Sequence, residues 1–423
     1  MTPSPAQAPG SPNFPMGFRE FVALIACLMA VNALAIDIML PALPEIGRDL
    51  GLTNANQRQY VVFAYTAGFG VAQLIYGPIS DRVGRKPVVL AALFAYIVTA
   101  VAAGFANSFD TILVARALQG VAAAATRVLA VSIVRDRFQG RQMARVMSLS
   151  FIVFLAVPIL APTLGKAILL VAPWHWIFFA LAIFAALIAA FAWVRLPETL
   201  HPEFRLPLSP ARIGRAAWQV VTIRCSIGYT LCSTLLFGAL MGFIGSSEQI
   251  FSAGFGAGDT FPLIFAGIAG SMAVASFVNS RIVERVGTRK VSHWALLTYI
   301  AIAAVHLLVI LSGRETIGTF AVLQAVTMAS FALAVSNFNS MAMEPHGQIA
   351  GTASSVQGFL STSLGVVVGV VIGQSFDASQ PTLALGVGHF VLGLSTLAIV
   401  LWTERGRLFR PTSPAPSAQA VKG

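Results

Sequence analysis

Asp81-Arg-Val-Gly-Arg-Lys-Pro-Val88 recurs later in this chain as Glu284-Arg-Val-Gly-Thr-Arg-Lys-Val291. Each copy is a short basic stretch that follows the second long apolar run of its half of the sequence. A repeat in corresponding positions of two halves predicts a chain built from two related units, with any binding site between them. Chance similarity between two basic loops is the alternative, which the number of apolar runs and the linker between the halves disfavour.

Around this repeat the chain is strongly apolar. Hydrophobic residues make up 57% of its 423 residues and charged residues only 10%, against roughly a quarter charged in soluble domains. The apolar residues fall into runs of about twenty, the length of a membrane-spanning helix. We therefore predict an all-α membrane protein with twelve transmembrane helices in two six-helix halves. The predicted spans are 18–41, 59–80, 87–106, 111–134, 145–168, 173–195, 217–246, 260–282, 291–312, 316–341, 350–375 and 382–403.

The placement of the basic residues that give the chain its net charge of +11 indicates the membrane topology. With a cytoplasmic N-terminus, 21 of the 27 Lys and Arg residues fall on the cytoplasmic side, four fall outside and two lie within a span. This asymmetry is the positive-inside rule. It predicts that both termini are cytoplasmic and that the basic loops meet anionic lipid, rather than nucleic acid.

Three segments lack apolar periodicity. Residues 1–17 and 404–423 are Pro-, Ser- and Ala-rich in large part, and we expect disordered cytoplasmic tails. Residues 196–216 are polar and broken by prolines, which predicts a cytoplasmic linker between halves 18–195 and 217–403.

The first copy of the repeat carries a family resemblance. Gly77-Pro-Ile-Ser-Asp81-Arg82-Val-Gly84-Arg85-Lys86-Pro87 resembles the loop signature between the second and third helices of the major facilitator superfamily. The resemblance implies a latch that closes the cytoplasmic side and breaks during transport. The latch residues expected from both copies are Gly77, Asp81, Arg82, Gly84, Arg85, Lys86, Glu284, Arg285 and Gly287.

Further stretches narrow the resemblance. Leu113-Val-Ala-Arg116-Ala-Leu-Gln119-Gly120 is similar to the fourth-helix signature, whose arginine is functional. Val157-Pro158-Ile-Leu-Ala-Pro162-Thr-Leu-Gly165 resembles the fifth-helix antiporter signature, which Pro158, Pro162 and Gly165 carry. With Asp37-Ile-Met-Leu-Pro41 and Val134-Arg135-Asp136-Arg137, the resemblance is to the 12-helix drug:proton antiporters of the bicyclomycin and chloramphenicol resistance (Bcr/CflA) subfamily.

Ionisable residues inside spans are functional candidates, because a charge in the bilayer centre costs at least roughly 2.5 to 3.5 kcal/mol. Asp37 is the only carboxylate well inside a span, and Arg116 reaches a similar depth on a helix of opposite direction. We hypothesise a switchable Asp37–Arg116 pair that couples protons to transport. A static salt bridge that orients the two helices is the alternative.

Two more charges are candidates. Arg127 follows Arg116 by about three helical turns, so both are expected on one face lining a polar cavity; the alternative is that Arg127 extends towards the cytoplasmic end. Glu248, near the outer end of the seventh span, is a second candidate for proton coupling, with surface placement as the alternative.

The substrate cavity should be apolar and aromatic with a few polar groups. Candidate residues within the spans, besides Arg127, are Asn32, Tyr65, Gln119, Phe154, Phe237, Met241, Asn337 and Phe359. Contact with lipid or a neighbouring helix is the alternative for the Phe and Met residues.

The sequence has no phosphate-binding loop and no metal-protease motif, so we expect no nucleotide, cofactor or metal. Together these features predict a monomeric bacterial inner-membrane protein that exports small amphiphilic compounds by proton antiport and alternating access. A dedicated metabolite exporter or symporter would have the same fold. An intramembrane enzyme or a transporter-derived sensor is disfavoured, because the histidines are scattered over different helices.

Overall fold

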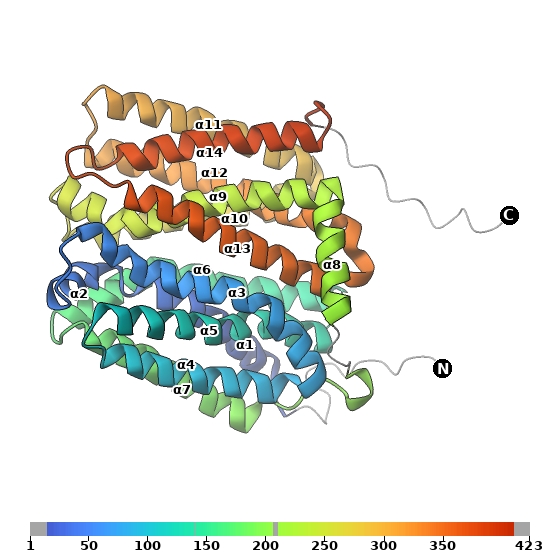
Figure 1. Cartoon of the computed structure of the whole chain (residues 1–423). Helices are drawn as coiled ribbons and strands as arrows, with labels where there is room; N and C mark the ends of the chain where they lie inside the picture. Colours follow the sequence, from blue (N-terminus) through green and yellow to red (C-terminus); the bar gives the residue numbers. More distant parts are fainter. Residues whose placement is uncertain (1–14, 139, 206–209, 410–423) are drawn as a thin grey trace.

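The computed structural model describes residues 15–138, 140–205 and 210–409 and is almost wholly helical (Figure 1). The long helices of the first half are α1 (Phe18–Asp37), α3 (Tyr60–Val83), α4 (Arg85–Gly104), α5 (Phe109–Arg137), α6 (Gly140–Leu169) and α7 (His175–Arg195). Those of the second half are α9 (Arg224–Gln249), α10 (Phe261–Val286), α11 (Thr288–Leu311), α12 (Ile317–Met343), α13 (Ala350–Gln374) and α14 (Leu383–Thr403). Short helices join them: η1 (Leu40–Ala42), α2 (Leu43–Asp49), η2 (Ala55–Gln59), η3 (Pro202–Phe204), α8 (Pro210–Thr222), η4 (Ile250–Gly254) and η5 (Glu344–Ile349).

The predicted membrane fold is confirmed. Within the described residues, 11 helical segments are long and apolar enough to cross a bilayer, and α6 adds the shorter apolar stretch Ala156–Leu169. Large apolar side chains of the long helices, such as Leu187 and Leu263, are exposed, as expected where lipid replaces water.

The helices form two bundles that lie against each other (Figure 1). The first bundle holds α1 and α3–α7, and the second holds α9–α14. They meet where α3 packs against α13 and α6 against α10. We call the side where α1 begins and α14 ends the terminal face, and the side where α1 ends the far face.

Glycines set the close approach of α3 and α5 inside the first bundle. A Cβ atom on Gly120 would collide with the carbonyl of Tyr65, and one on Gly68 with the carbonyl of Ala117. Small residues at such crossings let two helix backbones touch, which is the main source of packing energy between membrane helices. The glycine of the fourth-helix signature therefore has a packing role.

Both copies of the repeat form the same sharp break between two helices. Gly84 separates α3 from α4 with φ +114°, and Gly287 separates α10 from α11 with φ +91°. Such positive φ angles are readily adopted only by glycine, which explains why this position of the loop is the same in both copies.

The predicted linker differs from the structure at its end. Residues 210–222 form α8, a helix whose Val220 is buried with Ala353 and Val356 of α13 while Trp218 is 69% exposed. The membrane helix that was expected from 217 begins at Arg224, because apolar residues of α8 belong to the face that covers α13.

The predicted tails differ from the structure in two places. Met16, expected in the N-terminal tail, is 1% exposed and packs in the hydrophobic core. Residues 1–14 and 410–423 lie outside the described part of the chain. Residues 404–409, expected in the C-terminal tail, are ordered: Glu404 is 7% exposed, and the Phe409 amide donates to Nδ1 of His293 over 3.1 Å. Polar contacts with the second bundle hold this segment in place. The sequence prediction missed these contacts because it was based on apolar periodicity.

Candidate functional site

Asp37 is the last residue of α1 and only 4% exposed. Within the described chain no hydrogen bond or ion pair engages its carboxylate. The next residue, Ile38, touches α6, where a Cβ on Gly165 would strike the Ile38 carbonyl. Gly165 of the predicted antiporter signature, which follows Pro158 and Pro162 within α6, thus lets that helix approach the chain beside Asp37.

Arg116 on α5 is fully buried, and its bonds go to neutral acceptors. It donates to the Val61 carbonyl over 3.1 Å, to the Ala35 carbonyl over 3.0 Å and to Oε1 of Gln119 over 2.7 Å. The predicted Asp37–Arg116 ion pair is absent from the described structure. Backbone carbonyls of α1 and α3 satisfy the guanidinium instead, so the arginine fastens three helices together.

Three predicted substrate residues gather around this arginine. The Arg116 guanidinium carbon lies 4.4 Å from the centroid of the Tyr65 ring, and the Tyr65 hydroxyl donates to Oδ1 of Asn32 over 3.1 Å. Tyr65 and Gln119 are fully buried, and Asn32 is 9% exposed. We call Asn32, Tyr65, Arg116 and Gln119 the polar core of the first bundle.

Arg127, on the same helix, has different surroundings from Arg116. Its side chain is exposed, and its guanidinium carbon lies 5.9 Å from the centroid of the Phe69 ring on α3. Arg116 is sealed by its three acceptors, whereas Arg127 is accessible to solute.

The remaining substrate candidates lie in different surroundings. Phe237 and Met241 of α9 face α13, close to Gly365 and Gly369. Phe359 is half-buried.

Asn337 is 2% exposed and donates to Oδ1 of Asn279 over 2.8 Å, so it joins α12 to α10. The side chain of Phe154 lies outside the described side chains.

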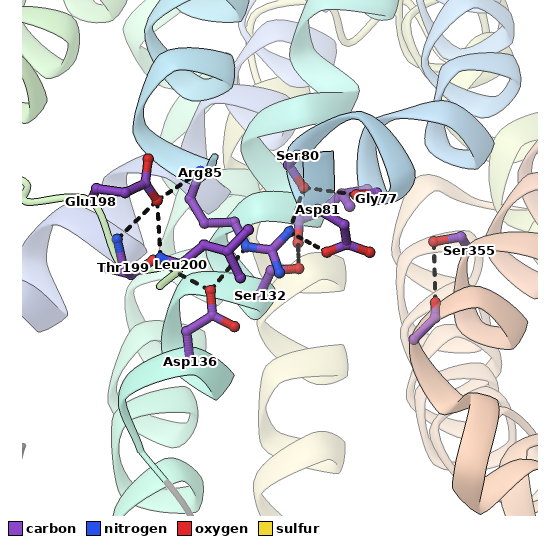
Figure 2. Close-up of polar contacts among 12 residues, drawn as sticks. Gly77, Ser80, Asp81, Arg85, Ser132, Asp136, Glu198, Thr199, Leu200 and Ser355 are labelled. Atoms are coloured by element: carbon purple, nitrogen blue, oxygen red, sulfur yellow. Dashed lines mark hydrogen bonds and ion pairs between the residues drawn. The ribbon is translucent and has the colours of Figure 1, made fainter. Parts of the chain in front are cut away.

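The loop between α3 and α4 holds a cluster of charges at the terminal face (Figure 2). The Arg85 side chain, 3% exposed, lies 2.9 Å from Oδ2 of Asp136 on α5 and 2.7 Å from Oδ1 of Asp81. It also donates to the Ser80 hydroxyl over 2.5 Å. These contacts lie within the first bundle, so the described ion pair of Asp81 joins α3 to α4 rather than to the second bundle.

Glu198, just beyond α7, completes this cluster. Its carboxylate accepts from the backbone amides of Arg85, at 2.9 Å, and Lys86, at 3.3 Å, which are the first residues of α4 (Figure 2). A carboxylate is favoured there, because the amides at a helix N-terminus lack partners within the helix. Lys86 reaches back to the Trp193 carbonyl near the end of α7 over 2.8 Å. Arg82, also predicted for the latch, is exposed.

The second copy of the repeat builds its ion pairs from a different residue. Glu284 and Arg285 are exposed, and in the described chain Arg289 makes the ion pairs instead, with Glu344 over 3.3 Å and Glu404 over 3.0 Å. Burial raises the pKa of Glu404, but hydrogen bonds from Tyr229 and Arg289 outweigh it and hold that pKa below its usual value. The prediction that Glu284 and Arg285 serve as latch residues is therefore not supported by contacts.

At the terminal face the two bundles come together at small residues. A Cβ on Gly77 would lie 3.5 Å from the Ser355 hydroxyl of α13, and one on Gly351 would lie 2.9 Å from the Arg135 guanidinium. Nearer the middle of α3, Gln73 donates to the Thr362 hydroxyl of α13 over 3.0 Å.

Among the described residues, most polar contacts between the bundles lie at the far face. We call Asn56, Gln59, Gln249 and Gln374 the amide cluster. Gln249 on α9 donates to Asn56 over 2.8 Å and is also bonded to Gln59. Asn56 and Gln374 exchange bonds between side chain and backbone, at 3.1 and 2.9 Å.

Two ion pairs also join the bundles at the far face. Arg58 of η2 lies 2.8 Å from Oε2 of Glu248 on α9, and Lys166 of α6 lies 2.7 Å from Oδ1 of Asp259, just before α10. Each pair joins one bundle to the other. Glu248 is 4% exposed, so the surface placement considered from sequence is wrong. With the amide cluster, these pairs close the far face.

The sequence did not single out the amide cluster, Gln73 or Glu198. Polar residues within an otherwise apolar run, such as Gln73, were the available signal. The amides of Asn56 and Gln59 lie in a short polar loop, where nothing distinguishes a side chain that faces water from one that faces another helix.

Comparisons with known proteins agree with this architecture. The chain is 30% identical over 373 residues to the uncharacterized MFS-type transporter YdgK of Bacillus subtilis, covering 88% of this chain and 92% of YdgK. It is 30% identical over 395 residues to the bicyclomycin resistance protein homolog of Haemophilus influenzae (91% and 96% covered), and 28% identical over 389 residues to the multidrug resistance protein MdtL of Klebsiella pneumoniae (90% and 95%).

Solved structures share the fold. The xylose transporter XylE of E. coli superimposes with a TM-score of 0.73 at 10% identity, covering 92% of this chain and 97% of that one. A peptide transporter, POT, gives 0.73 at 16% identity, covering 95% and 98%. The family model described as Major Facilitator Superfamily matches residues 25–370. The chain is therefore a secondary transporter, not an enzyme, and belongs to the Major Facilitator Superfamily.

Proposed function

We propose that this transporter exports small amphiphilic compounds in exchange for protons. The observation that carries the proposal is Asp37, a carboxylate buried at the end of α1 without a cation partner in the described chain. An isolated ionised carboxylate is costly inside a membrane protein, so such a group readily takes up a proton when the surroundings close over it. The relatives named for bicyclomycin and multidrug resistance support export.

The proposed orientation places the terminal face in the cytoplasm of a bacterial inner membrane. The arginine-rich loop that contains Arg82 and Arg85 lies on this face, together with Arg285 and Arg289 of the second copy, as the positive-inside rule expects. The far face, which the amide cluster closes, then meets the outside. In this orientation the structure represents a state closed to the outside, and the same Asp37 must become accessible there when the far face opens.

We propose that the substrate lies between the bundles near Arg127 and Phe359, two of the predicted residues whose side chains are not fully buried. The polar core around Arg116 is sealed and has a supporting role. An accessible arginine favours neutral or anionic amphiphiles over cations. The chain is proposed to act as a monomer.

A susceptibility panel in an efflux-deficient bacterial host tests this function. Cells expressing the protein should tolerate at least one class of amphiphilic compound better than vector controls. Cells expressing Asp37→Asn at equal membrane abundance should match the vector. Equal tolerance with and without the Asp37 carboxylate would refute the proton role, and no change with any compound would favour a dedicated metabolite exporter.

A further inference from the structure

The closure of the far face contains one buried ion pair among neutral amides. The Glu248 and Arg58 side chains are 5% and 13% exposed, and they come from different bundles. The second Glu248 oxygen, Oε1, accepts from the Ser252 hydroxyl over 2.5 Å. Asn56, Gln59, Gln249 and Gln374 carry no charge at any accessible pH, so proton uptake by the amide cluster itself is excluded.

No other charged side chain in the described chain contacts this pair. The elements that pack around the end of α9 present Ser252 from η4, and Gly373 and Gln374 from α13, which are neutral. Asp37, at the end of α1, is buried but does not contact this pair, and the main remaining charged groups of this face are engaged elsewhere, exposed or half-buried. They are Glu45, Arg48, Asp49, Lys166, Asp259, His306, Arg314, Glu315 and Asp377; Asp49 accepts from Trp174, Lys166 pairs with Asp259, His306 pairs with Glu315, and Asp377 accepts from Ser379.

Loss of either charge destabilises this arrangement. A charged side chain that stays buried after losing its partner is strongly unfavourable, and this free-energy cost falls when water hydrates the charge. If a proton binds Oε2 of Glu248, the pair with Arg58 is broken and a guanidinium of low exposure is left without a counter-ion. Separation of the two bundles at the far face hydrates that guanidinium.

We propose that Glu248 is a proton-binding site at the outer closure, and that Arg58 is the group its protonation releases. One proton from the far-face solution converts the Glu248 carboxylate to the neutral acid, so the net charge of the pair rises from zero to +1, the charge that Arg58 already carries. The closed state therefore weakens when the outside is acidic. The proposal rests on the proposed alternating access of this transporter, and it assigns a proton site separate from Asp37.

Distance measurement between the bundles tests the proposal without any transported compound. Spin labels at Leu170→Cys and Leu311→Cys report on the far-face ends of α6 and α11, where both side chains project outwards, 77% and 66% exposed. The native cysteines at 27, 225 and 232 are replaced by serine. Pulsed electron paramagnetic resonance of the full chain in lipid nanodiscs then gives the populations of closed and open far-face states.

Between about pH 8 and about pH 5.5, the ratio of closed to open should fall on the order of tenfold in the labelled parent. Glu248→Gln should be shifted towards the open state at both pH values, with little further change. Arg58→Gln should reverse the pH response, because its unpaired Glu248 carboxylate destabilises the closed state at about pH 8 and the uncharged acid at about pH 5.5 does not; this variant also guards against a folding defect specific to position 248. Asp377→Asn, which removes an exposed far-face acid, should respond like the parent.

The proposal is overturned if the parent shows equal populations at both pH values, or if Glu248→Gln responds as fully as the parent. Failure of drug export in the susceptibility panel would leave these populations unaffected. The two claims therefore fail separately.

Discussion

Arg85→Ala should destabilise the first bundle, and the structure gives the size of the effect. Arg85 is 3% exposed and lies between Asp136, which is 13% exposed, and Asp81, which is 33% exposed (Figure 2). Removing one partner of a buried ion pair costs about 3 to 5 kcal/mol, whereas a pair open to water contributes about 0.2 to 1 kcal/mol. The Asp136 contact therefore dominates, and we expect a loss of about 3 kcal/mol.

Thermal unfolding in detergent measures this loss. A thiol-reactive dye reports the exposure of the native cysteines, among which Cys232 is fully buried. For a chain of this size a loss of about 3 kcal/mol corresponds to a fall in Tm of roughly 3 to 6 °C. Arg85→Lys should recover part of it, because an ammonium keeps the charge but not the forked geometry.

Arg82→Ala is the matched control, since Arg82 is the neighbouring arginine of the same loop and is exposed. It should unfold within about 1 °C of the parent. Equal melting of Arg85→Ala and the parent would refute the assignment of the cluster as a structural tie within the first bundle.

Three further outcomes follow from the contacts. Gly120→Ala should cost more than about 1 to 3 kcal/mol, because its Cβ meets backbone atoms, whereas Gly267→Ala, with open space around the Cβ, should be neutral or stabilising; melting temperatures compare them. Arg116→Lys should lose about 1 to 3 kcal/mol and much of its transport, because an ammonium cannot reach three separate acceptors, as unfolding and export assays can measure. A hydrogen bond from Lys166 holds the pKa of Asp259 below its usual value. The pair therefore stabilises the closed far face fully at any pH above the usual pKa of an aspartate, and this stabilisation is lost only as the pH falls through the lowered pKa of Asp259. Asp259→Asn should therefore shift the far-face distances equally at about pH 5.5 and about pH 8.

The transmembrane fold could be predicted because lipid imposes a length requirement that each apolar run displays directly. The two-bundle arrangement followed from the repeat, whose Gly84 and Gly287 both make a turn that other residues rarely adopt. The end of the linker was mispredicted since Trp218 and Val220 are apolar, and run length alone does not separate a helix lying on the bundle from one entering the membrane.

The candidate site was predicted only in part. Burial of Asp37 and Arg116 could be inferred from their place in apolar runs. The partners of Arg116 could not, because two of them are backbone carbonyls, which every residue carries. The contact of Glu248 with Arg58 joins residues from different bundles, and their pairing depends on a conformational state that sequence spacing does not encode.

The central claim is that the Asp37 carboxylate carries the coupled proton. Purified protein in liposomes can be loaded with a compound that the susceptibility panel identifies, and its movement followed with and without an imposed pH gradient. We predict that Asp37→Asn still exchanges labelled for unlabelled compound across the membrane but no longer accumulates it in response to the gradient. Gradient-driven accumulation by Asp37→Asn at the rate of the parent would contradict the account.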